Sequence, residues 1–261
     1  MAETHSNDGQ LTVVLVHGAF ADASSWNGVI ARLQDAGIQA TAPANPLRGI
    51  SIDSAYVASV IEQIPGPVLA VGHSYGGAVI SNAAVKAPNV EALVFVAAFA
   101  PDEGERLGDV TASSKDAVLG SALVAHQVPG SNGDEPGVEF TVDPTKFREA
   151  FASDLSAKEA AIMAATQRPV AESAFSESSN AAAWKRLPSF AIVATADKAA
   201  GTDLTRSMAQ RAGATITELD GSHVIMVSRP QSVTDVILEA AGVAPSEHTW
   251  GDVLVESYLE E

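Results

Sequence analysis

The sequence predicts a doubly wound α/β fold with a mostly parallel central sheet. Short apolar runs recur along the chain, with helical stretches between them. Runs that are apolar on both faces are typical of strands buried between two layers of helices, and strands that alternate with helices favour one parallel sheet. Four runs have this pattern: Leu11–Val16, Pro67–Gly72, Val90–Ala97 and Ser189–Thr195.

Helices and two weaker strands complete the pattern. The helical stretches are expected at about Ser24–Ala36, Ser51–Gln63 and Tyr75–Lys86. The weaker strand candidates are Ile38–Ala42 and Ala214–Leu219. These elements give the chain the regular order of a sheet with helices on both faces.

A final helix is expected near Pro230–Ala241. Ser228 and Gln231 have the spacing of a capping box, and Pro230 suits a first helical turn, so we expect the helix to begin here. Gly242 is a suitable helix stop. The tail that follows, residues 244–261, is either a short extra helix or without regular structure, and its role stays open.

The regular order of strands and helices stops after Ala97. Residues 101–187 contain no convincing buried strand, and a connection this long is generally functional or has elements of its own. We therefore expect a cap or lid of residues 101–187, inserted into a core of residues 1–100 and 188–243.

The cap is expected to be largely helical. Its first part is rich in Gly, Ser, Asp and Pro, whereas the stretch of about Pro144–Ala165 is typical of helices. Ser156 lies three residues before Glu159, which is the spacing of a capping box at the start of a helix.

The composition is that of an acidic globular protein. The 261 residues include 15 Lys and Arg against 32 Asp and Glu, which gives a formal net charge of −17. Nucleic acids and anionic membrane surfaces are bound through clustered basic side chains, so this charge argues against both as partners. We expect a small-molecule substrate, and a monomer or a homodimer.

The sequence has no cysteine. This excludes disulfides, cysteine-ligated metals and thiol catalysis, and no motif for a metal or a cofactor is visible, so we expect neither. The first ten residues lack the basic and then apolar pattern of a signal peptide. No apolar run reaches the length of a membrane span, and we expect a cytoplasmic protein.

The strongest motif is Gly72-His73-Ser74-Tyr75-Gly76, which fits Gly-x-Ser-x-Gly between a predicted strand and a predicted helix. A tight turn at this point lifts the serine hydroxyl above the sheet, and the two glycines relieve the crowding. The serine then lies at a helix N-terminus, where the field favours developing negative charge. This context predicts Ser74 as a nucleophile.

A serine hydroxyl needs a base to act as a nucleophile at neutral pH. Folds with this motif have the chain order serine, then acid, then histidine. Three histidines follow Ser74: His126, His223 and His248. Only His223 lies between the last predicted strand and the last helix, where a base can reach back over the carboxyl ends of the strands. We therefore interpret His223 as the base.

The acid is expected just past the strand Ser189–Thr195, at Asp197. A carboxylate there can accept the other imidazole N–H and fix the tautomer of the base. Asp102, which follows the strand ending at Ala97, is the main rival. Asp203 and Asp220 fit the strand-end geometry less well.

An acyl-transfer site also needs two backbone N–H groups aimed at the oxyanion. Tyr75, the residue after the serine, supplies one of them. Ala19, which follows His17-Gly18 at the end of the first long strand, can supply the other. We expect a structural role for His17, which would tie this loop through hydrogen bonds, and core packing for Trp26.

A resemblance to the α/β-hydrolase superfamily lies in the segments VLVHGAFADASSW, VGHSYGGAVI, LVFVAAFAPDEGE, ATADK and GSHVIMVSRP. These segments are similar to small bacterial esterase-like members, related to the plant methylesterase and hydroxynitrile lyase branch. The resemblance covers roughly residues 11–242. It implies an α/β-hydrolase fold, a cap between the sixth and seventh strands and no cofactor. The triad that it implies is Ser74, His223 and Asp197, with an oxyanion hole at Ala19 and Tyr75.

The resemblance implies hydrolysis of a carboxylic ester of a small or medium-sized apolar substrate, through an acyl-enzyme on Ser74. Dehalogenases and epoxide hydrolases of this fold use a carboxylate nucleophile, so Ser74 argues against both. Hydroxynitrile lyases of the related branch have a Lys after the catalytic His and a Thr near the oxyanion strand. This sequence has Val224 and Gly18 at those positions, which argues against a hydroxynitrile lyase. The open alternatives are a lactonase, a C–C bond hydrolase, a cofactor-free perhydrolase or haloperoxidase, a cofactor-free dioxygenase, and a ligand-binding receptor.

The substrate pocket is expected to be apolar and partly lined by the cap. Its candidate residues are Phe20, His126, Phe147, Phe151, Met163 and Met226. Each of these side chains also suits the packing of a core, so the sequence does not separate the two roles.

Overall fold

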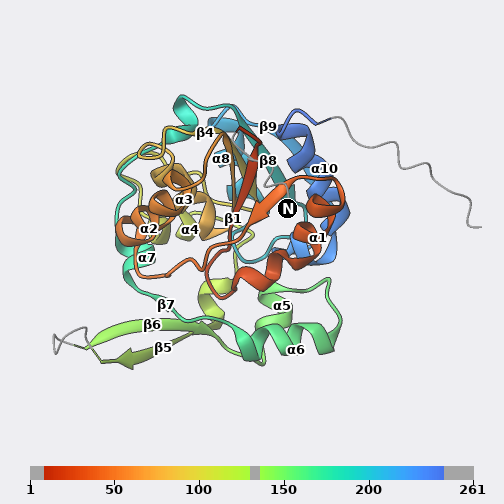
Figure 1. Cartoon of the computed structure of the whole chain (residues 1–261). Coiled ribbons are helices and arrows are strands. Elements are labelled where there is room, and N and C mark those ends of the chain that lie inside the picture. The colour runs from red at the N-terminus through yellow and green to blue at the C-terminus, as the bar shows by residue number, and fades with distance from the viewer. Residues whose placement is uncertain (1–8, 130–135, 244–261) are drawn as a thin grey trace, which may run out of the picture.

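A parallel sheet lies at the centre of the computed structural model, which describes residues 9–129 and 136–243 (Figure 1). Its strand order is β2-β1-β3-β4-β8-β9, and every pairing is parallel. The strands are β1 (Thr12–Val16), β2 (Gln39–Thr41), β3 (Val68–His73), β4 (Val90–Val96), β8 (Ser189–Ala194) and β9 (Thr215–Leu219). The predicted fold class is therefore confirmed, including both weaker strands.

The central strands are buried on both faces. Every residue of β1 and β3 is buried, and in β4 only Glu91 is exposed. Strands that contact helices on both sides need apolar residues at successive positions, which explains why these three strands were visible as continuous apolar runs.

Helices cover both sides of the sheet. The helices of the core are η1 (Ala23–Trp26), α1 (Asn27–Asp35), α2 (Ile50–Glu62), α3 (Tyr75–Ala83), α8 (Thr202–Arg211), α9 (Ile225–Ser228) and α10 (Pro230–Ala240). α2 packs against α3, and α1 packs against α10 on the opposite side of the sheet (Figure 1). Within the described ranges, no helix is both long and apolar enough to span a membrane.

The last helix begins at Pro230, as expected, but the predicted capping box is wrong. Ser228 is the final residue of α9, so it is already helical and cannot cap the next helix. Arg229 precedes Pro230 and makes no side-chain capping hydrogen bond. Gly242, with φ 68°, follows the helix in the left-handed region that favours glycine. The tail whose structure we predicted, residues 244–261, lies outside the described residues.

The segment of residues 101–187, which we call the cap segment, joins β4 to β8. Its elements are α4 (Leu107–Ala112), η2 (Leu119–Ala122), β5 (Leu123–Val128), β6 (Gly137–Val142), α5 (Phe147–Phe151), α6 (Ala157–Thr166), β7 (Val170–Ala171), α7 (Ser173–Ser176) and η4 (Ala183–Lys185). The cap segment follows the fourth strand of this chain and not a sixth, which corrects the position that the resemblance implied.

The expectation of a largely helical cap is wrong for its first part. β5, β6 and β7 form a three-stranded antiparallel sheet, and the β5–β6 hairpin extends away from the core (Figure 1). Most residues of β5 are exposed. A strand that is open on both faces needs no continuous apolar run, so it lacks the pattern of a buried strand. The helices of the second part, with the capping box between Ser156 and Glu159, are confirmed.

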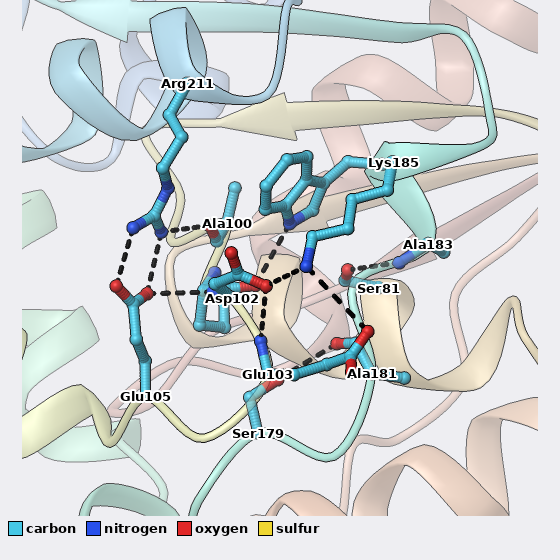
Figure 2. Close-up of polar contacts among 12 residues, drawn as sticks. Ser81, Ala100, Asp102, Glu103, Glu105, Ser179, Ala181, Ala183, Lys185 and Arg211 are labelled. Atoms are coloured by element: carbon cyan, nitrogen blue, oxygen red, sulfur yellow. Dashed lines mark hydrogen bonds and ion pairs between the residues drawn. The ribbon is translucent and has the colours of Figure 1, made fainter.

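The two ends of the cap segment are joined to the core at one place (Figure 2). The Lys185 ammonium, where the chain leaves the cap, pairs with Asp102, where it enters. The Arg211 guanidinium at the end of α8 binds both carboxylate oxygens of Glu105, at 2.6 and 2.7 Å. The Trp184 indole N–H donates to the Pro101 carbonyl at 3.0 Å. The entry and the exit of the cap segment are therefore held together beside α8.

Candidate active site

The turn between β3 and α3 holds Ser74 in a conformation that few residues adopt. Ser74 has φ 52° and ψ −121°. Its N–H donates to the Val96 carbonyl at 3.2 Å, and its carbonyl accepts from Gly77 N–H at 3.0 Å and from Phe99 N–H at 3.1 Å. These hydrogen bonds fix the unfavourable backbone from both sides. A non-glycine residue keeps a strained positive φ only where the surrounding structure holds it, and such residues are common at active sites.

The glycines around Ser74 are required by close backbone contacts. A Cβ on Gly76 would lie 2.4 Å from the Val16 carbonyl oxygen, and one on Gly72 would lie 2.5 Å from the Gly76 carbonyl oxygen. A Cβ on Gly18 would lie 2.7 Å from the Cβ of Ser74. The expected relief of crowding by glycine is thus confirmed, and the loop after β1 lies directly against the serine.

His223 and Asp197 form a buried pair at the carboxyl ends of two neighbouring strands. Asp197 follows β8 and His223 follows β9, and the exposed fraction of each is 1%. The imidazole Nδ1 lies 2.8 Å from Oδ2 of Asp197. The other carboxylate oxygen accepts from the N–H groups of Ala199 and Ala200, at 2.8 and 3.0 Å. With Nδ1–H donated to the carboxylate, Nε2 is the ring nitrogen left to accept a proton.

The three rival carboxylates have other partners. Asp102 pairs with Lys185 (Figure 2). Asp203 accepts from the Lys115 N–H at 2.8 Å and from the Ser114 hydroxyl. Asp220 lies 3.4 Å from the Thr195 hydroxyl. Among the four candidates, the structure brings Asp197 to His223.

Two further histidines are buried beside this pair. His17 accepts from the Asn45 N–H at 3.0 Å and donates to the Gly18 carbonyl at 2.9 Å, which is the loop-tying geometry that we expected. The His73 Nε2 lies 2.9 Å from the His223 carbonyl oxygen. Burial lowers the pKa of His17 to about 4 and holds that of His73 well below its usual range. Both rings are therefore neutral at neutral pH.

The predicted oxyanion donors lie in two fixed backbone segments. Ala19 is buried in the loop after β1, and Tyr75 is the first residue of α3. The Tyr75 hydroxyl donates to Asp53 at 2.7 Å, and the same carboxylate accepts from the Arg48 N–H at 3.0 Å. Burial raises the pKa of Asp53. Sequence reasoning missed Asp53, because a contact across 22 residues leaves no local pattern.

Aromatic side chains from the core and the cap segment gather over His223. The Phe151 ring centroid lies 5.0 Å from the His223 ring and 5.0 Å from the Phe147 ring. Phe20 contacts Phe151 edge to face at 6.2 Å and stacks on Phe175 at 6.4 Å. Sequence reasoning missed Phe175, which lies in a cap helix that it did not predict.

A small cavity lies between the loop after β1 and α6. Its volume is about 110 Å³. Phe20 and Met163 line it, together with Ala21, Asp22, Ser24, Ser25, Thr166, Gln167 and Val227. A larger open hollow of about 660 Å³ between β9 and α10 is lined by none of the candidate site residues.

Two candidate substrate residues lie outside both this cavity and the aromatic cluster over His223. His126 is exposed on β5 and lies 2.8 Å from the Thr141 hydroxyl across the hairpin, which extends away from the core. Met226 is buried in α9 and, unlike Phe20 and Met163, does not line the cavity. The prediction of His126 as a substrate-binding residue is therefore wrong, and that of Met226 stays a prediction. Among the described residues, no three His, Asp or Glu side chains gather closely enough to hold a metal ion.

Comparisons with known proteins find similar sequences and a similar fold. The sequence profile described as "Alpha/beta hydrolase family" matches residues 13–236. The esterase PIR7B of Oryza sativa subsp. japonica is 26% identical over 264 residues, which cover 90% of this chain and 97% of that protein. The putative chloroplastic methylesterase 12 of Arabidopsis thaliana is 26% identical over 253 residues, 88% of this chain and 71% of that protein. The crystal structure of polyneuridine aldehyde esterase has a TM-score of 0.76 at 21% identity, and the match covers 89% of this chain and 99% of that one.

The close contact at Gly76 predicts a large loss of stability in Gly76→Ala. The Val16 carbonyl is backbone and cannot move aside, so the free energy of unfolding should fall by about 3 kcal/mol or more. Urea unfolding measures this loss. Gly120→Ala is the control, because no heavy atom lies within 4 Å of the added methyl, and its change should stay below about 0.5 kcal/mol. Similar losses in both variants would contradict the close contact.

The low pKa of His17 predicts acid destabilisation. Between its ordinary value of 6.5 and about 4, the unfolded imidazole binds a proton and the folded one does not. The free energy of unfolding therefore falls as pH drops through this window, by up to about 1.4 kcal/mol per pH unit for one such group. In His17→Gln, which keeps an acceptor for the Asn45 N–H, the slope should be smaller by up to this amount. Urea unfolding from pH 7 to pH 4.5 compares the slopes, and equal slopes would contradict a neutral buried His17.

Proposed function

The chain belongs to the alpha/beta hydrolase family, and we propose that it is a serine hydrolase that cleaves a carboxylic ester of a small or medium-sized apolar substrate. The observation that supports this most is the buried hydrogen bond between His223 and Asp197, at the carboxyl edge of the sheet, where Ser74 follows β3. A carboxylate on Nδ1 leaves Nε2 free to accept a proton, which a serine nucleophile requires.

In the proposed mechanism, the Ser74 hydroxyl attacks the acyl carbon while Nε2 of His223 takes its proton. The N–H groups of Ala19 and Tyr75 donate to the oxyanion. His223 then returns the proton to the leaving alcohol, which gives an acyl-enzyme on Ser74. Water, activated by the same histidine, releases the acid and restores the serine. Asp197 holds the imidazole in the tautomer that both half-reactions need.

The names of the relatives support an ester as the substrate class, because the rice protein is named an esterase and the Arabidopsis protein a putative methylesterase. The surroundings of His223 support an apolar substrate. We propose that Phe20, Phe147, Phe151 and Met163 contact it, since the first three are buried in one aromatic cluster and Met163 faces the same small cavity as Phe20.

A cytoplasmic location and a monomeric or homodimeric state are part of the proposal. The acidic composition supports a small-molecule substrate over a nucleic acid or an anionic membrane. A cofactor has no part in the proposed steps.

Ser74→Ala should abolish ester hydrolysis. Release of p-nitrophenol from short acyl esters should fall by at least about 1,000-fold, because the acyl-enzyme cannot form. Ser113→Ala, at an exposed serine of the cap segment, is the matched control and should keep the wild-type rate. Equal rates for Ser74→Ala and the wild type would reject the proposed nucleophile.

The choice of acid predicts opposite outcomes for two aspartates. Asp197→Asn should lower kcat by about 1,000- to 10,000-fold, because the amide favours the wrong tautomer of His223. Asp102→Asn should change kcat by less than about 2-fold, because Asp102 pairs with Lys185 in a partly exposed ion pair, whereas His223 pairs with Asp197. Steady-state kinetics on the same ester give both values. The reverse order of the two effects would transfer the role of acid to Asp102.

A further inference from the structure

Asp154, between α5 and α6 of the cap segment, contacts the loop that holds His223. Its Oδ2 accepts a hydrogen bond from the Ser222 N–H at 2.9 Å, and its Oδ1 accepts one from the Ser222 hydroxyl. Ser222 is buried and adjoins His223 in the chain. One carboxylate of the cap segment thus binds both donors of the residue that precedes the proposed base.

The cap backbone around Asp154 is itself fixed. The Arg148 Nε donates to the Leu155 carbonyl at 3.0 Å, and the Leu155 N–H donates to the Ala152 carbonyl at 3.1 Å. The capping box at Ser156 begins the next helix immediately afterwards. The carboxylate is therefore presented from a rigid turn and restrains the position of Ser222.

The contact is charged and closely packed. Burial alone would raise the pKa of Asp154, but the hydrogen bonds to the carboxylate, with that of the Ser222 hydroxyl the largest, together more than offset this, so the pKa lies below its usual range and the group is ionised at neutral pH. Hydrogen bonds to an ionised carboxylate are stronger than those between neutral groups. A Cβ on Gly221 would lie 2.9 Å from Oδ2 of Asp154, so a larger residue there would meet the carboxylate.

The ring of His223 is held by the core and by the cap segment. From the core, His73 contacts it with ring centroids 4.7 Å apart, and Asp197 binds its Nδ1 at 2.8 Å. From the cap segment, Phe151 contacts the ring at 5.0 Å, and Asp154 fixes the preceding residue. The cap segment also reaches the loop of Asp197, where the Val118 N–H donates to the Lys198 carbonyl at 2.8 Å. Among the described hydrogen bonds, however, none from the cap segment reaches the Asp197 carboxylate itself.

We propose that Asp154 is a positioning residue for His223, which fixes the loop of residues 221–223 from the cap side and thereby the direction of Nε2. Asp154 acts through Ser222 and contacts no reacting atom. The inference rests on the proposed function, because it assigns Asp154 to the base of that same site. If Asp154 has this role, His223 is correctly placed only when the cap segment packs against the loop of residues 221–223.

Asp154→Ala is the direct test, with p-nitrophenyl acetate as substrate. We expect kcat to fall by about 10- to 100-fold, the range expected when hydrogen bonds to a charged group are lost, while KM changes by less than about 3-fold. Asp154→Asn keeps an acceptor for the Ser222 N–H and should recover most of kcat. Ser222→Ala removes only the hydroxyl and should fall between the two. In the His223→Ala background, Asp154→Ala should cause no further loss, because it acts through His223.

Asp203→Ala is the matched control. Asp203 also accepts from a serine hydroxyl and a backbone N–H across the junction of core and cap segment, at Ser114 and Lys115, but it does not contact the loop of His223. Its kcat should stay within about 2-fold of the wild type. Thermal unfolding of every variant is measured beside the kinetics. If Asp154→Ala does not fold, Asp154→Asn and Ser222→Ala decide the test.

The outcomes separate this inference from the proposed function. Wild-type kcat in Asp154→Ala and Ser222→Ala, with an inactive His223→Ala, would overturn the inference alone. An equal loss from Asp154→Ala in the wild-type and His223→Ala backgrounds would also overturn it, because the effect would not pass through the base. If His223→Ala were as active as the wild type, the proposed function itself would fail.

Discussion

The close approach of backbone segments at the turn after β3 is the constraint on which the rest of the site depends. Gly76 lies against the Val16 carbonyl, and Gly18 lies against Ser74, at distances that exclude a side chain at either glycine. This contact brings the end of β1 against the turn after β3, where hydrogen bonds hold Ser74 at a positive φ. Without these two close contacts, the loop with Ala19 could not lie directly beside Ser74 and the start of α3.

The remaining parts come from neighbouring strands of the same sheet and from the cap segment above them. Because parallel strands end at a common edge, β8 and β9 deliver Asp197 and His223 to the side where β3 delivers Ser74. The cap segment adds Phe151 over the imidazole and Asp154 on the loop before it. The proposed base is thus held by the core at Nδ1 and at its carbonyl, and by the cap segment through its ring and its loop.

The sequence allowed the sheet and the proposed triad to be predicted because both depend on local patterns. β1, β3 and β4 are buried on both faces and were visible as apolar runs, and Ser74 lies in a motif with fixed spacing. The β5–β6 hairpin escaped prediction because exposed strands need no such pattern. Ser228 matched a capping box by spacing alone, although its backbone belongs to the preceding helix. The contacts of Asp53 with Tyr75 and of Asp154 with Ser222 join residues 22 and 68 positions apart, and nothing local in the sequence records them.

The central claim is that Ser74 is a nucleophile activated by His223, and covalent labelling with a fluorophosphonate tests it most directly. The reagent phosphonylates an activated serine with loss of fluoride, independently of which ester the protein cleaves. The account predicts one phosphonyl group per chain by intact mass, located on the peptide that contains Ser74. A folded protein that stays unlabelled, or that is labelled at another residue, would contradict the account.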